Sequence, residues 1–308
     1  MENAGGHNWV TIKIPDNSYF VSANQSRIGN VDLNDKENVL SSPNLLSFAK
    51  KEGLYNSKTD GDFSFRKVFG KDTDADKSYN YNRVKYLQNL FTPSQKKLSY
   101  SDNSFPTLLV PETKISLTDV EKALQSHYNN TEQDAYNKED ASVSPRPISV
   151  YRTRQSHILT RDPKLPLPIA NIEYLNLGMT ALGIYVPFYQ GSTPPYAYTV
   201  ASKQADNVSA YWKYRKLQMM GMLNFPEYAP IIQKRLSLLN DQIQHEQNTF
   251  EKMYLSLCKK DPEGDKILLN NFTTQTAEGS LAVAQDLTNQ LMTIQSSKIN
   301  QEYLFSGA

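Results

Sequence analysis

The sequence of 308 residues is poor in cysteine and has no excess of charge of either sign. Its single cysteine, Cys258, excludes an intramolecular disulfide framework and is typical of proteins from a reducing compartment. Thirty-three basic and thirty-two acidic residues leave a net charge of +1. Because nucleic-acid binders neutralise phosphates with an excess of basic residues, we expect no nucleic-acid partner.

Long hydrophobic runs are also missing. The amino-terminal segment lacks the apolar stretch of a secretory signal, so we expect a cytoplasmic location or incorporation into an assembled particle. The most apolar window, residues 169–188, contains Asn171, Glu173 and Pro187. A membrane-spanning helix needs about 20 predominantly apolar residues, so this window predicts a buried core segment, at 169–186, and disfavours membrane contact.

The common catalytic and cofactor motifs are absent as well. The sequence has no glycine-rich dinucleotide loop, no P-loop, no nucleophile elbow and no paired-histidine zinc motif. Its histidines, at positions 7, 127, 157 and 245, do not have the spacing of metal ligands, and His245 beside Glu246 is expected on an exposed helix face. We therefore expect no catalytic residues of a familiar type, no metal and no cofactor.

Three alternating aspartates, Asp72, Asp74 and Asp76, are the nearest approach to a calcium loop. Such a loop has glycine at its sixth position and glutamate at its twelfth. Lys77 and Arg83 stand at these two positions. A solvated acidic turn is favoured over a calcium site, although the sequence leaves cation binding there open.

Two further places suggest chemistry. Lys259 and Lys260 next to Cys258 would lower the pKa of its thiol, but its position on an apolar helix seam favours a small buried side chain. The segment SVYRTRQSH, residues 149–157, places Arg152 and Arg154 beside Tyr151 on an expected strand. Arginines on a strand could hold the phosphates of a nucleotide, as a nucleotide-using transferase would require.

The chain is expected to have three regions. Residues 1–140 are polar and loop-rich, with a strand at 9–14 and helices at 42–53 and 116–128. Ser42 is expected to cap the first of these helices and Gly53 to end it. Residues 141–204 form a proline-rich connector around the buried apolar segment, and residues 205–308 are helical.

Apolar residues at heptad spacing predict two long helices near the carboxyl end. Two helices of roughly 29 residues, separated by a breaker sequence at 259–265, predict an antiparallel hairpin with a connecting loop of about ten residues. The predicted fold class is therefore mainly α, with this hairpin following a loop-rich α+β region. The seam residues expected to form an interface are Leu236, Leu239, Ile243, Phe250, Met253, Leu257, Leu287, Leu291 and Ile294.

The last helix, residues 276–303, opens with small residues and carries an NQLM-x-x-Q pattern at 289–295. It resembles the final helix of the minor pilus-tip proteins of type IV secretion and conjugation systems. This resemblance implies a structural component of a secretion machine. A composition rich in Asn, Lys and Tyr is also typical of phage virion proteins.

These observations predict a non-enzymatic structural or assembly protein that docks into a larger complex through its carboxyl-terminal helices. Its partners would be other protein subunits, with copies of itself as one option. The alternative is a bacterial effector or an enzyme, such as a nucleotide-using transferase, with its site around residues 149–157.

Overall fold

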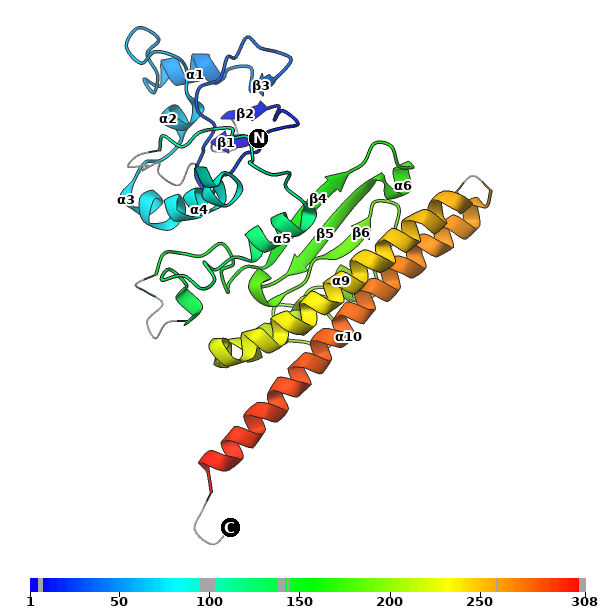
Figure 1. The fold of residues 1–308 in the computed structure, drawn as a ribbon. Helices are drawn as coiled ribbons and strands as arrows, with labels where there is room; N and C mark the ends of the chain where they lie inside the picture. Colours follow the sequence, from blue (N-terminus) through cyan, green and yellow to red (C-terminus); the bar gives the residue numbers. More distant parts are fainter. Residues whose placement is uncertain (5–7, 95–102, 138–141, 143, 259, 305–308) are drawn as a thin grey trace. The chain divides into compact units, whose positions relative to one another are not determined.

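The computed structural model describes residues 1–4, 8–94, 103–137, 142, 144–258 and 260–304 (Figure 1). It divides into two compact units: unit 1 comprises Met1–Leu117 and Ser142–Arg146, and unit 2 comprises Thr118–Ala141 and Pro147–Ala308. The predicted boundaries near residues 140 and 204 stay a prediction, since 138–141 lie outside the described residues. His7 and Lys259 lie outside them too.

Unit 1 contains a small antiparallel sheet in the order β1-β2-β3. The strand predicted at 9–14 is confirmed as the central strand β2, where Val10 is buried opposite Ser41. The elements of unit 1 are β1 (Glu2–Ala4), β2 (Asn8–Ile12), β3 (Val39–Ser41), α1 (Leu45–Lys51), α2 (Phe65–Phe69), α3 (Asp74–Asp76), a π-helical turn (Lys77–Tyr81) and α4 (Asn82–Phe91).

Helix α1 confirms the helix predicted at 42–53, but its first turn begins later than expected. The Ser42 hydroxyl accepts a hydrogen bond from the backbone N–H of Trp9 on β2, at 3.3 Å, and does not cap the helix. Gly53 ends this segment as predicted, with φ of +70°, a left-handed conformation that glycine adopts without strain.

The acidic turn is only partly solvated. Asp72 and Asp74 are exposed, whereas Asp76 is fully buried and pairs with Arg27 at 2.9 Å. The Arg27 guanidinium also lies over the rings of Tyr81 and Phe105, at 5.3 and 5.5 Å. Among the described residues, no group of three or more His, Cys, Asp or Glu side chains is arranged to hold a metal.

Unit 2 is built around a second antiparallel sheet, in the order β4-β5-β6, and long helices. Its elements are α5 (Leu117–Gln125, whose first residue belongs to unit 1), a 3₁₀ turn (Ala135–Asn137), β4 (Gln155–Arg161), α6 (Leu167–Ala170), β5 (Asn171–Leu177), a second 3₁₀ turn (Thr180–Leu182), β6 (Val186–Tyr189), α7 (Tyr196–Thr199), α8 (Ala210–Leu223), α9 (Phe225–Leu257) and α10 (Pro262–Glu302). Helix α5 confirms the helix predicted at 116–128.

The apolar segment predicted to be buried forms the centre of this sheet. Residues 171–177 and 186–189 are β5 and β6, and the residues between and around them are largely buried. Across the part of the chain that the structure describes, no helix combines the length and apolarity needed to cross a bilayer.

The predicted helical hairpin is present as α9 and α10, which run antiparallel (Figure 1). They are longer than predicted, at 33 and 41 residues, because the expected breaker is much shorter. Only residues 258–261 connect them. The Asp261 carboxylate caps α10 by accepting from the Gly264 N–H at 2.9 Å, and Pro262 suits the first helical turn, so this sequence starts a helix.

The predicted fold class, mainly α, is nevertheless wrong. Each unit has its own three-stranded sheet, and in unit 2 one core cluster joins β6 with α8, α9 and α10. Heptad spacing identifies a helix with an apolar stripe but does not say what covers the stripe. Here the helices pack on a sheet as well as on each other.

Candidate functional site

The predicted interface residues lie mostly in the interior of unit 2. Six of them, Leu236, Leu239, Ile243, Phe250, Leu287 and Leu291, are buried. Leu257 and Ile294 are half-buried, and Met253 is 49% exposed. The buried side chains pack within the chain itself, and their use by a partner subunit stays a prediction.

The segment at 149–157 is not a single strand with convergent arginines. Strand β4 begins only at Gln155. The Tyr151 ring lies 4.9 Å from the guanidinium of Arg215 on α8, which also donates to the Tyr151 carbonyl at 2.5 Å. Arg152 and Arg154 are exposed. Tyr151 therefore anchors this segment to α8, while the two arginines face solvent.

The histidines and the cysteine have separate surroundings. His127 is buried, with Nδ1 2.7 Å from the Asp134 carboxylate and its ring against Phe225 at 5.1 Å. His157 and His245 are exposed, as predicted for His245. Cys258 is half-buried at the end of α9, where its thiol donates to the Leu255 carbonyl at 3.6 Å.

A cavity of about 480 Å³ lies on the sheet of unit 2. We call it the sheet pocket. All three strands contribute to it, together with the segment that follows β6. Its lining includes Leu159, Arg161, Asn171, Glu173, Phe188 and Gln190.

The strand register arranges the main side chains of the sheet pocket. Leu159 lies opposite Glu173, which lies opposite Phe188, and Arg161 lies opposite Asn171. Opposite residues of antiparallel strands share a face, and so do residues two apart in one strand. Arg161 and Glu173 are therefore diagonal neighbours on one face, a relation that separates their backbones by about 7–8 Å.

The sheet pocket offers two opposite charges beside apolar surface. Arg161 and Glu173 are both exposed, and Leu159 is 70% exposed beside the largely buried Phe188. The segment that follows β6 and lines one edge of the pocket is attached to α10, because the Thr193 N–H donates to the Asn270 side chain at 2.9 Å. This arrangement is complementary to a small molecule with a cationic end, an anionic end and an apolar body.

Sequence reasoning missed Arg161 and Glu173. They stand on different strands and meet only through the register of β4 and β5. The alternation of polar and apolar residues in QSHILTR indicates a strand, but it does not indicate which residues of another strand lie beside it.

Comparison with known proteins places the chain in a family. Residues 1–237 match the sequence model of peptidase family C69. The chain belongs to this family. The match covers both sheets and both strands that hold Arg161 and Glu173, whereas Cys258 lies outside it.

Several bacterial relatives of this chain carry the name dipeptidase. A probable dipeptidase of Salmonella dublin is 45% identical over 191 residues, which are 62% of this chain and 44% of the relative. One from Latilactobacillus sakei is 34% identical over 223 residues, or 71% and 46% of the two chains. Dipeptidase A of Lactobacillus helveticus is 29% identical over 294 residues, or 94% and 58%. The chain thus spans about half the length of the curated relatives it matches.

Family membership overturns several predictions. The resemblance to minor pilus-tip proteins is wrong, and so are the structural or assembly role and the association with secretion machines or virions. A pattern of glutamines on an amphipathic helix is common to many unrelated proteins, and residues 276–303 lie beyond the matched region. The alternative, an enzyme, agrees better with the family, although the family is one of peptidases and not of nucleotide-using transferases.

Proposed function

We propose that this chain functions in the hydrolysis of dipeptides and that the sheet pocket binds the dipeptide. The observation that carries the proposal is the match of residues 1–237 to peptidase family C69, together with the dipeptidase names of its relatives. Hydrolysis of a dipeptide adds water across its one peptide bond and releases two amino acids.

The placement of Arg161 and Glu173 supports a dipeptide as the ligand. Two extended residues span at most about 7 Å, close to the 7–8 Å diagonal of neighbouring strands. The Arg161 guanidinium can hold the terminal carboxylate through two parallel hydrogen bonds, and the Glu173 carboxylate can accept from the terminal ammonium group. Leu159 and Phe188 offer apolar surface to the side chains of the dipeptide.

The test is a comparison of free and blocked peptides. The purified chain is incubated with alanyl-phenylalanine, with its N-acetyl and amide derivatives, and with the matching tripeptide. Release of free amino acids is followed by chromatography, and binding of each peptide is followed in parallel by nuclear magnetic resonance (NMR). We expect the free dipeptide to be cleaved and bound in preference to the other three. Equal cleavage and binding of the blocked peptides would contradict the proposal.

A further inference from the structure

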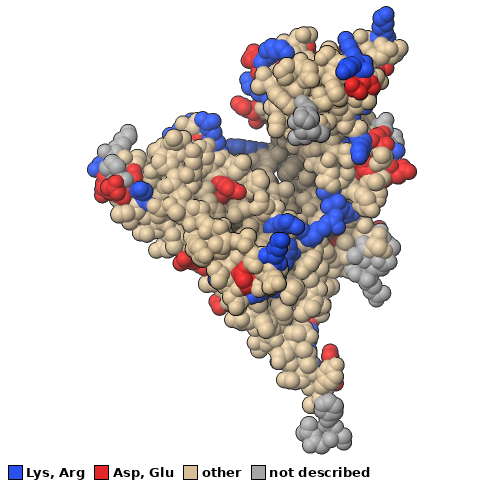
Figure 2. All heavy atoms as spheres, turned by 180° about the vertical axis from the view of Figure 1, so that it is seen from behind, with Lys and Arg blue, Asp and Glu red and all other residues tan. Residues whose placement is uncertain are grey.

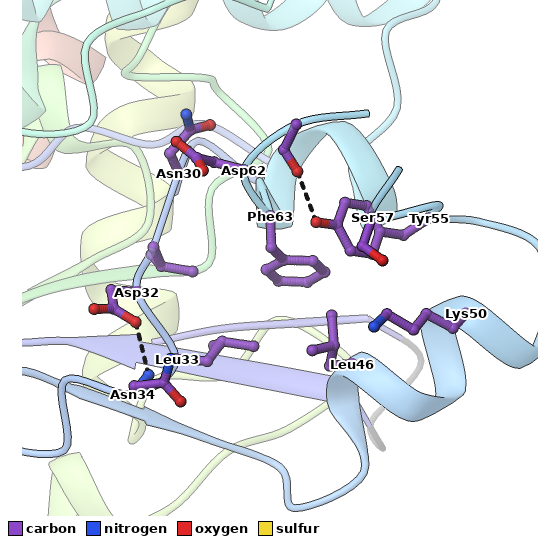
Figure 3. Close-up of a pocket in the computed structure, with 12 residues that line it drawn as sticks. Asn30, Asp32, Leu33, Asn34, Leu46, Lys50, Tyr55, Ser57, Asp62 and Phe63 are labelled. Carbon is purple, nitrogen blue, oxygen red and sulfur yellow. Dashed lines mark hydrogen bonds between the residues drawn. The ribbon is translucent and has the colours of Figure 1, made fainter. Parts of the chain in front are cut away.

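A second cavity, of about 490 Å³, lies wholly within unit 1. We call it the unit 1 pocket. Residues 30–34, helix α1 and the loop at 55–63 surround it (Figure 3). None of these residues belongs to the sheet pocket.

The floor of the unit 1 pocket is apolar and preformed. Tyr55 and Phe63 are buried and meet edge to face, with their ring centroids 5.3 Å apart. Leu33 and Leu46 are half-buried and pack against the same core cluster. The Tyr55 hydroxyl donates to the Gly61 carbonyl at 2.7 Å, which closes the loop that forms one wall. A pocket whose walls belong to the core needs little rearrangement to accept a ligand.

The rim carries more negative than positive charge. Asp32, Asp62 and Lys50 are its charged residues, so two carboxylates stand against one ammonium group. In Figure 3, Asp32 and Lys50 lie on opposite sides of the apolar floor. Asp62 lies beside Asn30, and their segments are paired through the hydrogen bond from Val31 N to the Phe63 carbonyl at 3.1 Å.

We propose that the unit 1 pocket binds an apolar primary ammonium ion, such as the free amino end of an apolar amino acid or peptide. The Asp62 carboxylate and the side-chain carbonyl of Asn30 accept from the ammonium group. The apolar side chain of the ligand covers Phe63 and Leu46. This proposal does not depend on hydrolysis by the chain. The two pockets are proposed to differ in the part of the ligand that they recognise: the sheet pocket recognises both ends of a dipeptide, and the unit 1 pocket recognises the amino end alone.

The experiment uses the complete chain and small probes of defined charge. Phenylalaninamide has an ammonium group and no carboxylate, whereas N-acetyl-phenylalanine has a carboxylate and no ammonium group. Backbone amide spectra are recorded by NMR during titration at mildly acidic pH, where the amine of the probe is protonated. We expect phenylalaninamide to shift the resonances of residues 30–34, 46–50 and 55–63 and N-acetyl-phenylalanine to leave them unchanged.

Three variants sharpen the test. Asp62→Asn should raise the Kd for phenylalaninamide about twofold to fivefold, the range expected for an exposed ion pair. Lys50→Gln should lower it by a similar factor, because a repelling charge is removed. Glu52→Gln, which removes an exposed carboxylate of unit 1 that does not line the pocket, should leave it unchanged. The proposal is overturned if N-acetyl-phenylalanine binds equally well, if only unit 2 resonances move, or if D62N and E52Q behave alike.

Discussion

The two units stabilise their sheets in different ways. The strands of unit 1 are 3, 5 and 3 residues long, whereas those of unit 2 are 7, 7 and 4 residues long. In unit 2 the sheet is covered by long helices that share one large apolar cluster. In unit 1 the apolar clusters are smaller, and buried charged side chains join segments that no strand pairing connects.

Glu2 and Arg27 illustrate how unit 1 compensates for its short strands. The Glu2 carboxylate accepts from the backbone N–H groups of Arg27 and Ile28, at 2.7 and 3.0 Å. The Arg27 guanidinium in turn donates to the Asp76 carboxylate on α3 and to the Asn103 side chain, both at 2.9 Å. A loop-rich unit can thus be held together by specific polar contacts, whereas the helical unit relies on buried apolar area.

Charges show a similar contrast between surface and interior. On the face seen in Figure 2, basic and acidic side chains are scattered among uncharged ones. Ion pairs between exposed side chains contribute little to the free energy of unfolding. Removing one partner of a buried ion pair costs much more, because the other charge is left buried and unpaired. The stability of unit 1 should therefore respond to Arg27 far more than to any surface charge.

The largest expected effect comes from Arg27→Ala. It leaves the Asp76 carboxylate buried without its partner, which should lower the free energy of unfolding of unit 1 by about 4 kcal/mol. The measurement is urea unfolding followed by Trp9 fluorescence in a Trp212→Phe background, since Trp9 is in unit 1 and Trp212 in unit 2.

The double variant R27M/D76L is the control for this prediction. Replacing both charges with apolar side chains of similar size avoids the unpaired carboxylate and should recover part of the lost stability, since the buried Asn80 amide, which donates to Asp76 at 2.7 Å, still loses its acceptor. If R27A unfolds at the same urea concentration as the parent chain, the buried pair does not hold unit 1 together.

The stability of unit 2 should be most sensitive to the loss of apolar side-chain volume from its core. Leu291 is fully buried against the core cluster, and Leu291→Ala should lower the free energy of unfolding by about 3 kcal/mol. Met292, its neighbour on α10, is 55% exposed, so Met292→Ala should cost less than about 1 kcal/mol. Urea unfolding of both variants, followed by Trp212 fluorescence in a Trp9→Phe background, compares them directly. Equal losses would contradict the assignment of the α10 seam to the core.

Glu121 makes the stability of unit 2 depend on pH. Burial raises the pKa of its carboxyl group from an ordinary 4.5 to about 7, although the Asn240 amide donates to it at 3.2 Å. The folded state keeps this proton between those two pH values while the unfolded state loses it, so stability falls as the pH rises from about 4.5 through about 7.

The variant Glu121→Gln should remove this slope. It should be more stable than the parent chain by about 1–2 kcal/mol above the upper pKa and equally stable at low pH, because glutamine keeps an acceptor for Asn240 without ionising. Thermal unfolding across this pH range is the measurement. A slope that persists in E121Q would show that another group is responsible.

The smallest expected effect concerns the proposed dipeptide site. Arg161→Gln should abolish the preference for a free dipeptide over its amide, and Glu173→Gln should abolish the preference over the N-acetyl form. Each change should raise the Kd for the free dipeptide about fivefold, near the upper limit for an exposed ion pair. Calorimetric titration of both variants measures it. Arg154→Gln is the control, since Arg154 is an exposed arginine that does not line the pocket.

Local features could be predicted from the sequence with fair success. The strand at β2, helices α1 and α5, the buried segment at 169–186 and the two long helices were all predicted, because periodicity, caps and turns act over a few residues. The connection at 258–261 was misjudged because Asp261 and Pro262 can end one helix or begin the next, and only their hydrogen bonds distinguish the two.

The residues of the proposed dipeptide site were not predicted. Tyr151, Arg152 and Arg154 attracted attention because they are adjacent in sequence, yet Tyr151 packs on Arg215 and the arginines face solvent. Function was misjudged for a related reason, since an amphipathic helix that packs on a sheet has the same pattern as one that docks on a partner.

By itself, the sequence determined that residues 205–308 are helical and which faces of the two long helices, α9 and α10, are apolar, since backbone hydrogen bonds four residues apart and a repeat of 3.6 residues are local properties. Only the tertiary structure decided that these faces cover a sheet, that Arg27 meets Asp76, and that Arg161 lies diagonal to Glu173. Such neighbours depend on strand register and packing between distant segments, which residue spacing does not encode.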